Sequence, residues 1–368
     1  MKRWNRWTSV TSRPPATVTR DRLRALFRSW AYAETHHNVF ATSETRPSSP
    51  RSDFTSLVAR DAATVERDVP RPLRRSYAGP VFRPSSEPES GYAEVLQAGA
   101  ELIGMPTPNG DVEMLRLALE GLSSVDLQSA QIHVGHAGFV RALLERTNLS
   151  PIDAERICNL MACHDREGLT TSLREAGVAN DDRTALIELL ELAGDQRIIE
   201  DARRLTHEPR AREALDELEA VTELLNDARI IVDLSEVRDL SYYTGIRFEG
   251  FSSGVGRAIL RGGRYDELLG AYGTPEPAVG CAFEIGALAE ALGPSSPSGP
   301  AGILLRFPPD RWDEAARQAE RLRAAGRSVA MDPMQIDDVE AYMQSYELTD
   351  LIDLSTCAAQ DRRTPCNR

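Results

Sequence analysis

The sequence predicts an α+β protein: an antiparallel sheet with flanking helices, interrupted by a helical insertion and followed by a short C-terminal α/β remnant. Two observations support this prediction. Segments with the two-residue periodicity of strands lie on both sides of about residues 139–227, where the periodicity is helical. After a linker rich in Pro, Ser and Gly at 294–300, a strand, a helix and a second strand follow within 301–368. We therefore expect a core over 53–293, in which strands before and after the insertion share one sheet.

The chain begins with a poorly defined segment and a predicted hairpin. Residues 1–52 alternate arginine-rich stretches with Pro, Ser and Thr, and only 20–30 has the pattern of a helix. Two strand patterns, 71–83 and 92–104, are separated by the turn-rich sequence PSSEPESG, which predicts an antiparallel hairpin. Asp111 follows, at the position where the N-cap of the next amphipathic run is expected.

Strand patterns border the insertion on both sides. Inside the insertion, almost the whole stretch has a helical pattern, with Gly and Asn at the breaks between helices. Strands are expected at 129–135, 228–237, 242–251, 256–263 and 277–285, and a helix at 286–292. The C-terminal remnant has the pattern of one βαβ unit at 301–307, 310–326 and 327–332. Residues from about 356 are polar and are expected to be frayed.

Composition and charge exclude several classes of function. The formal net charge is −13, from 43 basic and 56 acidic side chains, so tRNA or other nucleic acid is not an expected partner. The only lysine is Lys2, which excludes a phosphate-binding loop with its GK[ST] lysine and pyridoxal chemistry on a buried lysine. Few, irregularly spaced cysteines and the lack of a long apolar run predict a cytoplasmic protein without membrane contact. No cofactor is expected, and the spacing of Cys158, Cys163 and His164 argues against a metal site.

One group of polar residues could form the floor of a ligand site. Period two places Gln97, Gly99 and Glu101 on the same face of the second hairpin strand. The glycine leaves a gap between two polar side chains, and a small polar ligand could lie there. The alternative is that this face is the solvent-exposed polar side of an antiparallel sheet.

A second polar group follows the insertion. Arg238 precedes the adjacent tyrosines Tyr242 and Tyr243, and the segment GGRYD follows at 262–266. An arginine fork and hydroxyls on rigid rings suit a small zwitterion in a half-buried pocket. The tyrosines could equally be core residues with one satisfied hydroxyl. Tyr242 is the weaker candidate, because adjacent strand residues face opposite ways.

Taken together, these segments resemble the catalytic core of the histidyl-tRNA synthetases, and more closely the related regulatory subunits of ATP phosphoribosyltransferase. The similarity runs from about residue 51 to 292, and its blocks occur in the family's order. These blocks are RSDFT at 51–55, YAGPVFR at 77–83, EVLQAGAE at 94–101, YYTG at 242–245, GGRYD at 262–266 and PAVG at 277–280. The resemblance implies the antiparallel sheet of class II aminoacyl-tRNA synthetases and a site for L-histidine.

The resemblance also implies roles for individual residues. The implied histidine-binding site comprises Asp53, Thr55, Arg83, Gln97, Glu101, Arg238, Tyr242 and Tyr243. The first two would lie near the amino group of the ligand, and Gln97, Glu101 and Tyr243 around the imidazole. The two arginines match those that line the carboxylate and phosphate region of the synthetase. A glutamate can accept a hydrogen bond from an imidazole N–H, which agrees with the implied role of Glu101.

Departures from the synthetase pattern indicate that ATP activation is lost. In the segment 280–288, Ala287 stands where the resemblance places an ATP-binding arginine. Glu284 replaces a glycine and adds negative charge near where a triphosphate would lie. Asp239 and Ser241 replace the glycine and the acidic residue of the family's RGLDYY stretch.

The resemblance therefore predicts a noncatalytic regulatory subunit. It implies a hetero-oligomer with the short-form catalytic ATP phosphoribosyltransferase, a requirement for that enzyme's activity in the first step of histidine biosynthesis, and feedback regulation by L-histidine as effector. The alternative is an active or eroded histidyl-tRNA synthetase paralogue, and a third possibility is a binding module without this partner. Between the expected helix at 20–30 and Asp53 there is too little chain for the family's usual strand and dimer-forming segment, and the C-terminal remnant is shorter than a full anticodon-binding domain.

Overall fold

The computed structural model describes residues 15–40, 50–84, 92–235, 237, 242–273, 275–293, 302–346 and 348–355. The chain divides into two compact units. Thr19–Gly293 form the first, and the second includes the described residues from 302 onward. The polar residues after 355 that were expected to be frayed lie outside the described residues, as does the linker at 294–300.

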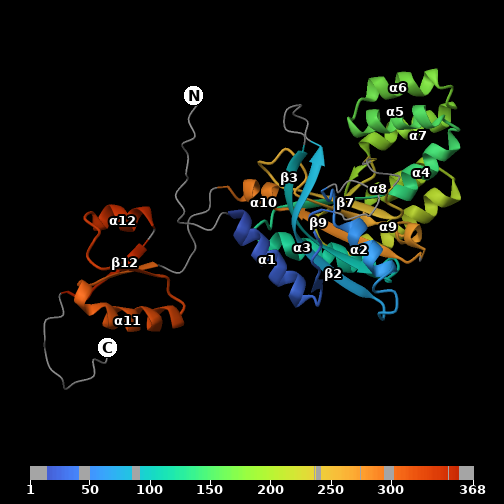
Figure 1. Ribbon diagram of the computed structural model, residues 1–368. Coiled ribbons are helices and arrows are strands. Elements are labelled where there is room, and N and C mark those ends of the chain that lie inside the picture. The colour runs from blue at the N-terminus through green and yellow to red at the C-terminus, as the bar shows by residue number, and fades with distance from the viewer. Residues whose placement is uncertain are drawn as a thin grey trace. The chain divides into compact units, whose positions relative to one another are not determined.

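A nine-stranded sheet forms the centre of the first unit (Figure 1). Its order is β1-β2-β3-β9-β8-β7-β4-β6-β5, and neighbouring strands from β2 to β4 are antiparallel. Because β3 pairs with β9 and β4 with β7, strands from both sides of the insertion share one sheet, as predicted. The strands are β1 (Ala33–Glu34), β2 (Leu73–Pro84), β3 (Tyr92–Ile103), β4 (Gln131–His136), β5 (Ala193–Gly194), β6 (Ile230–Asp233), β7 (Ile246–Phe251), β8 (Leu260–Arg264) and β9 (Ala278–Glu284).

Helices cover one face of this sheet at its centre. The helices outside the insertion are α1 (Pro15–Ser29), α2 (Thr55–Ala63), α3 (Asn109–Ser124) and α10 (Ile285–Leu292), with a 3-10 turn η2 (Leu269–Tyr272). Phe283 of β9 contacts Phe27 of α1, with ring centroids 6.3 Å apart. Gly121 lets α3 approach the same ring, because a Cβ there would lie 2.4 Å from the tip of Phe283. Residues that alternate with Phe283 along β9 therefore face away from α1 and α3.

The insertion is helical apart from one short strand, and its helices group together (Figure 1). Its elements are α4 (Ala137–Arg146), α5 (Pro151–Ala162), α6 (Arg166–Glu175), α7 (Asn180–Glu188), η1 (Leu189–Glu191), β5, α8 (Arg197–Leu205) and α9 (Pro209–Leu225). Local sequence sets several of these boundaries. Ser150 accepts a hydrogen bond from the backbone N–H of Asp153 at the start of α5, where Pro151 is the first residue. Asn226 ends α9 in the left-handed conformation, with φ 43°.

The second unit is a small parallel sheet with helices. Its elements are β10 (Gly302–Arg306), η3 (Pro309–Arg311), α11 (Trp312–Ala324), β11 (Val329–Asp332), α12 (Val339–Ser345) and β12 (Leu348–Asp353). The order is β11-β10-β12, and both pairs are parallel. The predicted βαβ unit is present. The sequence pattern missed α12 and β12, which add a third strand to the sheet beside β10.

Two local predictions need correction. The N-terminal helix begins at Pro15, five residues before the predicted start. Asp111 is not an N-cap: α3 begins at Asn109, and Asp111 lies buried in its first turn. There its carboxylate accepts a hydrogen bond from Nε of Arg264 at 2.9 Å, a partner 153 residues away. In the part of the chain that the structure describes, no helix combines the length and the apolar character that a bilayer crossing requires.

Candidate functional site

A cavity of about 430 Å³ opens on the face of the sheet that α1 and α3 leave uncovered. Its floor comes from β3, β8 and β9, and its walls from the start of α2 and the segment before β7. The volume is within the range of small-molecule sites in proteins. The residues that line it are Asp53, Thr55, Tyr77, Arg83, Gln97, Glu101, Tyr242, Tyr243, Arg261, Gly262, Gly263, Tyr265, Gly280, Cys281, Ala282 and Glu284.

Strand register explains how the floor is built. Gln97 and Glu101 of β3 are paired with Glu284 and Gly280 of β9, so their side chains share one face. Gly280 gives Glu101 its space, because a Cβ at that position would lie only 1.6 Å from Glu101 Oε2. The small residue Gly280 thus leaves room at the centre of the floor for the carboxylate of Glu101.

Glu101 is the best-anchored polar group in the cavity. Its side chain is 1% exposed, and Oε1 accepts hydrogen bonds from Thr55 Oγ1 at 2.7 Å and from the Tyr77 hydroxyl at 3.1 Å. Tyr265 donates its hydroxyl to Oε2. Burial raises the pKa of Glu101 from 4.5 to about 7, although the three hydroxyl donors act in the opposite direction. A group with this pKa can exchange a proton or a hydrogen bond with an imidazole near neutral pH.

Asp53 lies at the start of α2, at the rim of the cavity. Its Oδ1 accepts hydrogen bonds from both the backbone N–H and the hydroxyl of Ser56, and Oδ2 accepts one from Ser52 Oγ at 3.0 Å. These contacts fix the carboxylate beside the first turn of the helix. Because an ionised carboxylate has about four lone-pair sites, it can still accept a bond from a ligand ammonium group.

Three tyrosines surround the space above Glu101. Tyr242 and Tyr243 pack edge to face, with ring centroids 5.0 Å apart, and Tyr242 also lies 5.7 Å from the ring of Tyr265. Tyr243 lies over Gly263, where a Cβ would be 2.6 Å from its ring. Contrary to the prediction from strand alternation, Tyr242 and Tyr243 both line the cavity. Both precede β7, which begins at Ile246, so the alternation of strand side chains does not apply to them.

Three charged side chains of the cavity lining, Arg83, Arg261 and Glu284, belong to a row of alternating charges that continues beyond the cavity. Glu284 Oε1 lies 3.0 Å from Nη1 of Arg261 and 3.4 Å from Nη1 of Arg83. Arg261 and Arg247 both donate to Oε1 of Glu249, each at 2.9 Å. The guanidinium groups on this side of the cavity are therefore already paired with carboxylates of the chain itself.

The structure brings together seven of the eight residues named from the sequence. Arg238 lies outside the described residues. Nine lining residues were not among the predicted ligand-binding residues, and four of them carry large polar side chains: Tyr77, Arg261, Tyr265 and Glu284. Tyr265 carried a signal, since it belongs to the GGRYD segment, and Tyr77 stands opposite Gly99 in the hairpin register.

Comparison with known proteins decides the family. The sequence pattern of the family described as "Histidyl-tRNA synthetase" matches residues 17–288. The ATP phosphoribosyltransferase regulatory subunit of Bacillus licheniformis is 32% identical over 302 residues, which cover 81% of this chain and 77% of the relative. The chain belongs to the histidyl-tRNA synthetase-like family of ATP phosphoribosyltransferase regulatory subunits. The regulatory subunit of Geobacter sulfurreducens is 34% identical over 70% of this chain, and the chain spans 61% of that relative's length.

Solved structures agree with this family. A Bacillus halodurans protein described as an ATP phosphoribosyltransferase regulatory subunit/histidyl-tRNA synthetase superposes with a TM-score of 0.83 at 26% identity, covering 96% of this chain and 99% of that one. A chain of the ATP phosphoribosyl transferase complex from Thermotoga maritima has a TM-score of 0.57 at 17% identity, covering 73% of this chain and 97% of that one. The second likeness concerns the fold alone. The predicted class II synthetase-like fold is confirmed.

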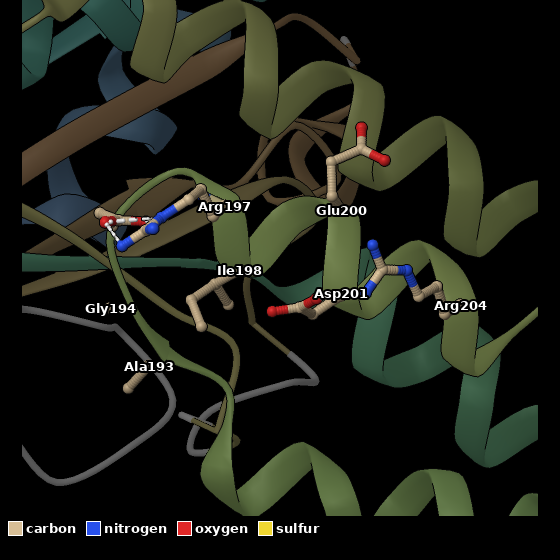
Figure 2. Close-up of a pocket in the computed structure, with 8 residues that line it drawn as sticks. Ala193, Gly194, Arg197, Ile198, Glu200, Asp201 and Arg204 are labelled. Carbon is tan, nitrogen blue, oxygen red and sulfur yellow. Dashed lines mark hydrogen bonds and ion pairs between the residues drawn. The ribbon is translucent and has the colours of Figure 1, made fainter.

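A second hollow, of about 560 Å³, lies in the insertion beside α8 (Figure 2). Arg197 and Asp195 form an ion pair there at 2.7 Å, but their side chains are 89% and 60% exposed. Figure 2 shows Glu200, Asp201 and Arg204 along the same helix, where Arg204 and Asp201 form a second exposed ion pair at 2.8 Å. Exposed charges that already pair with each other bind a ligand weakly. The candidate ligand site of this chain is therefore the cavity in the sheet and not this hollow.

Proposed function

We propose that this chain assembles with the short-form catalytic ATP phosphoribosyltransferase, is required for its activity, and transmits feedback by L-histidine bound in the sheet cavity. The names of the relatives support the regulatory role. A protein with the same fold from Thermotoga maritima is part of an ATP phosphoribosyl transferase complex, which supports the hetero-oligomer. An effector acts in such an assembly when it binds one conformation more tightly than another.

The observation that carries the histidine assignment is the environment of Glu101. Histidine offers an imidazole N–H, an ammonium group and a carboxylate. Glu101 is a buried acceptor for the imidazole N–H, and three hydroxyl groups hold its carboxylate in place. Asp53, whose carboxylate lies close enough to help raise the pKa of Glu101, is an acceptor for the ammonium group. The rigid rings of Tyr242 and Tyr243 line the same cavity.

The charged wall supports a regulatory role over amino-acid activation. ATP activation needs guanidinium groups that are available to phosphates, whereas Arg83 and Arg261 here share the carboxylate of Glu284. Ala287, at the position of the expected ATP-binding arginine, is buried and has no cationic group. A triphosphate would therefore lose the charge compensation that it requires.

Reconstitution tests the proposal. Purified chain is mixed with the short catalytic subunit, and phosphoribosyl transfer to ATP is measured with and without L-histidine. We expect transfer to depend on the chain, histidine to inhibit it, and Glu101→Ala to need at least about tenfold more histidine, because an acceptor in a charged hydrogen bond is worth about 1.4 kcal/mol or more. Glu223→Ala, an exposed glutamate on α9, is the matched control.

Two results would contradict the proposal. If phosphoribosyl transfer is unchanged by the chain, the catalytic subunit is not its partner. If the wild type and Glu101→Ala are equally sensitive to histidine, the cavity is not the histidine site. Histidine-dependent exchange between ATP and pyrophosphate by the chain alone would indicate a synthetase instead.

A further inference from the structure

We propose that Arg141 is a positioning residue that ties the cavity wall to the first helix of the insertion, so that an occupied cavity orders the insertion. The inference rests on the proposed histidine site and names the part of the chain that responds to it. It starts from Tyr243, whose ring lines the cavity. The backbone oxygen of Tyr243 accepts a hydrogen bond from Arg141 Nη2 at 2.7 Å.

The segment that carries Tyr243 is fixed between α4 and the end of β8. Gly245 O accepts a hydrogen bond from the N–H of Ala137, the first residue of α4, at 2.9 Å. On the other side, the N–H of Thr244 donates to Arg264 O at 2.7 Å, and Thr244 Oγ1 accepts from the N–H of Asp266 at 3.0 Å. A displacement of α4 would thus be transmitted to the ring of Tyr243.

The same helix reaches the rest of the insertion within one turn. Glu145, four residues after Arg141, pairs with Arg210 of α9 at 3.2 Å. Arg146 pairs with Asp182 of α7 at 3.0 Å. Because α4 follows β4 without an intervening loop, its first turn is anchored in the sheet and its last turn in the insertion. Arg141 lies between these two anchors.

The positive charge of Arg141 makes its hydrogen bond to the backbone oxygen of Tyr243 stronger than a neutral hydrogen bond. A guanidinium that donates to a backbone oxygen forms a charge-assisted hydrogen bond, which is roughly twice as strong as a neutral one. Arg141 is partly buried, so the contact is partly shielded from solvent. A ligand that fixes Tyr243 therefore also restrains α4, and the helices packed on α4 lose freedom with it.

Amide hydrogen exchange on the full chain, with L-histidine as the probe, tests this coupling. In the wild type we expect saturating histidine to slow exchange in α4 and α9 by about threefold or more. In Arg141→Ala we expect the affinity for histidine to fall roughly tenfold, since the charged hydrogen bond to the backbone oxygen of Tyr243 is lost. We also expect the protection of α4 and α9 to disappear even at saturation, while protection within β3 and β9 remains.

Two further variants separate coupling from folding. Arg141→Lys retains a cationic donor and should restore most of the protection. Arg166→Ala removes an exposed arginine of α6 that pairs with Glu191 and should behave like the wild type. A merely structural arginine would lower the melting temperature of Arg141→Ala but leave its histidine-dependent protection intact, and that result would overturn the inference.

The wild type alone can also refute the proposal. Histidine that binds and protects the sheet but leaves exchange in α4 and α9 unchanged would overturn the coupling and spare the histidine site. Absence of any histidine binding by the wild type would overturn both.

Discussion

A buried carboxylate is stable here because the chain supplies its hydrogen bonds before any ligand does. Glu101 is anchored by Thr55 and two tyrosines, and Gly280 provides the space for its head group. Such an acceptor needs no reorganisation to meet an imidazole, and its orientation is set by residues from four different segments. The cost is the raised pKa of Glu101, since burial disfavours the ionised form.

The raised pKa of Glu101 predicts how the stability of the fold depends on pH. The pKa of Glu101 is about 7 in the folded chain and 4.5 in the reference state, so the folded state holds an extra proton between these values. The stabilising contribution is complete below pH 4.5 and is lost as pH rises to about 7, a change on the order of 3 kcal/mol. In Glu101→Gln, which does not titrate, this part of the slope should vanish.

Chemical unfolding of the wild type and Glu101→Gln at a series of pH values between about 4.5 and 7.5 measures the difference. Glu223→Gln, at an exposed position, should follow the wild type. Parallel curves for the wild type and Glu101→Gln would show that the carboxyl group titrates in the folded protein as it does in the unfolded one.

Individual site residues were predictable to the extent that a local rule applied to them. Period two placed Gln97 and Glu101 on one face because β3 is a regular strand. The same rule failed for Tyr242, which lies before the strand begins. Tyr265 was missed because its hydroxyl meets Glu101 across 164 residues of sequence, a contact that only the folded sheet creates.

At the scale of elements, α3 and β8 are joined by one buried ion pair. Nη2 of Arg264 lies 2.8 Å from Oδ1 of Asp111, and the two side chains are 3% and 1% exposed. Arg264 also donates to Asp266 Oδ1 at 3.0 Å. The pair therefore fixes the end of β8, next to the segment that holds Tyr243.

Removing one partner of the Asp111–Arg264 ion pair should destabilise the folded protein. We expect Asp111→Ala to lower the free energy of unfolding by about 3–5 kcal/mol, because it leaves Arg264 buried without its main counter-ion. Asp201→Ala, which breaks an exposed pair with Arg204 on α8, should cost less than about 1 kcal/mol. Urea or guanidinium titration of both variants compares them, and similar midpoints would contradict a supporting role for the buried pair.

The sequence predicted long, periodic elements well and short ones poorly. The β2–β3 hairpin and the strands from β7 to β9 follow their hydrophobic pattern. The two-residue strands β1 and β5 have too few residues to show a period, and they form because β2 and β6 offer unpaired edges. Asp111 had the local signature of a cap, but its partner lies in a strand on the far side of the insertion.

At the scale of the whole molecule, the net charge is concentrated in the insertion. Residues 139–227 contain 20 acidic and 11 basic side chains, a net −9 of the total −13. Several of these arginines are already engaged: Arg203 contacts Glu219 at 2.7 Å, and Arg146 and Arg210 bind the carboxylates of Asp182 and Glu145. The carboxylates of the insertion thus outnumber its guanidinium groups and also pair with several of them, which disfavours a polyanion there.

This distribution predicts that tRNA does not bind. A protein that neutralises several phosphates gains affinity from counterion release and loses it steeply as salt increases. For this chain, anisotropy of labelled tRNA should give a dissociation constant weaker than about 100 μM at physiological salt, with little change when salt is lowered. A histidyl-tRNA synthetase measured in parallel provides the positive control. Binding in the low micromolar range with a strong salt dependence would mean that local arginines overcome the net charge of −13, and a tRNA partner would then have to be considered.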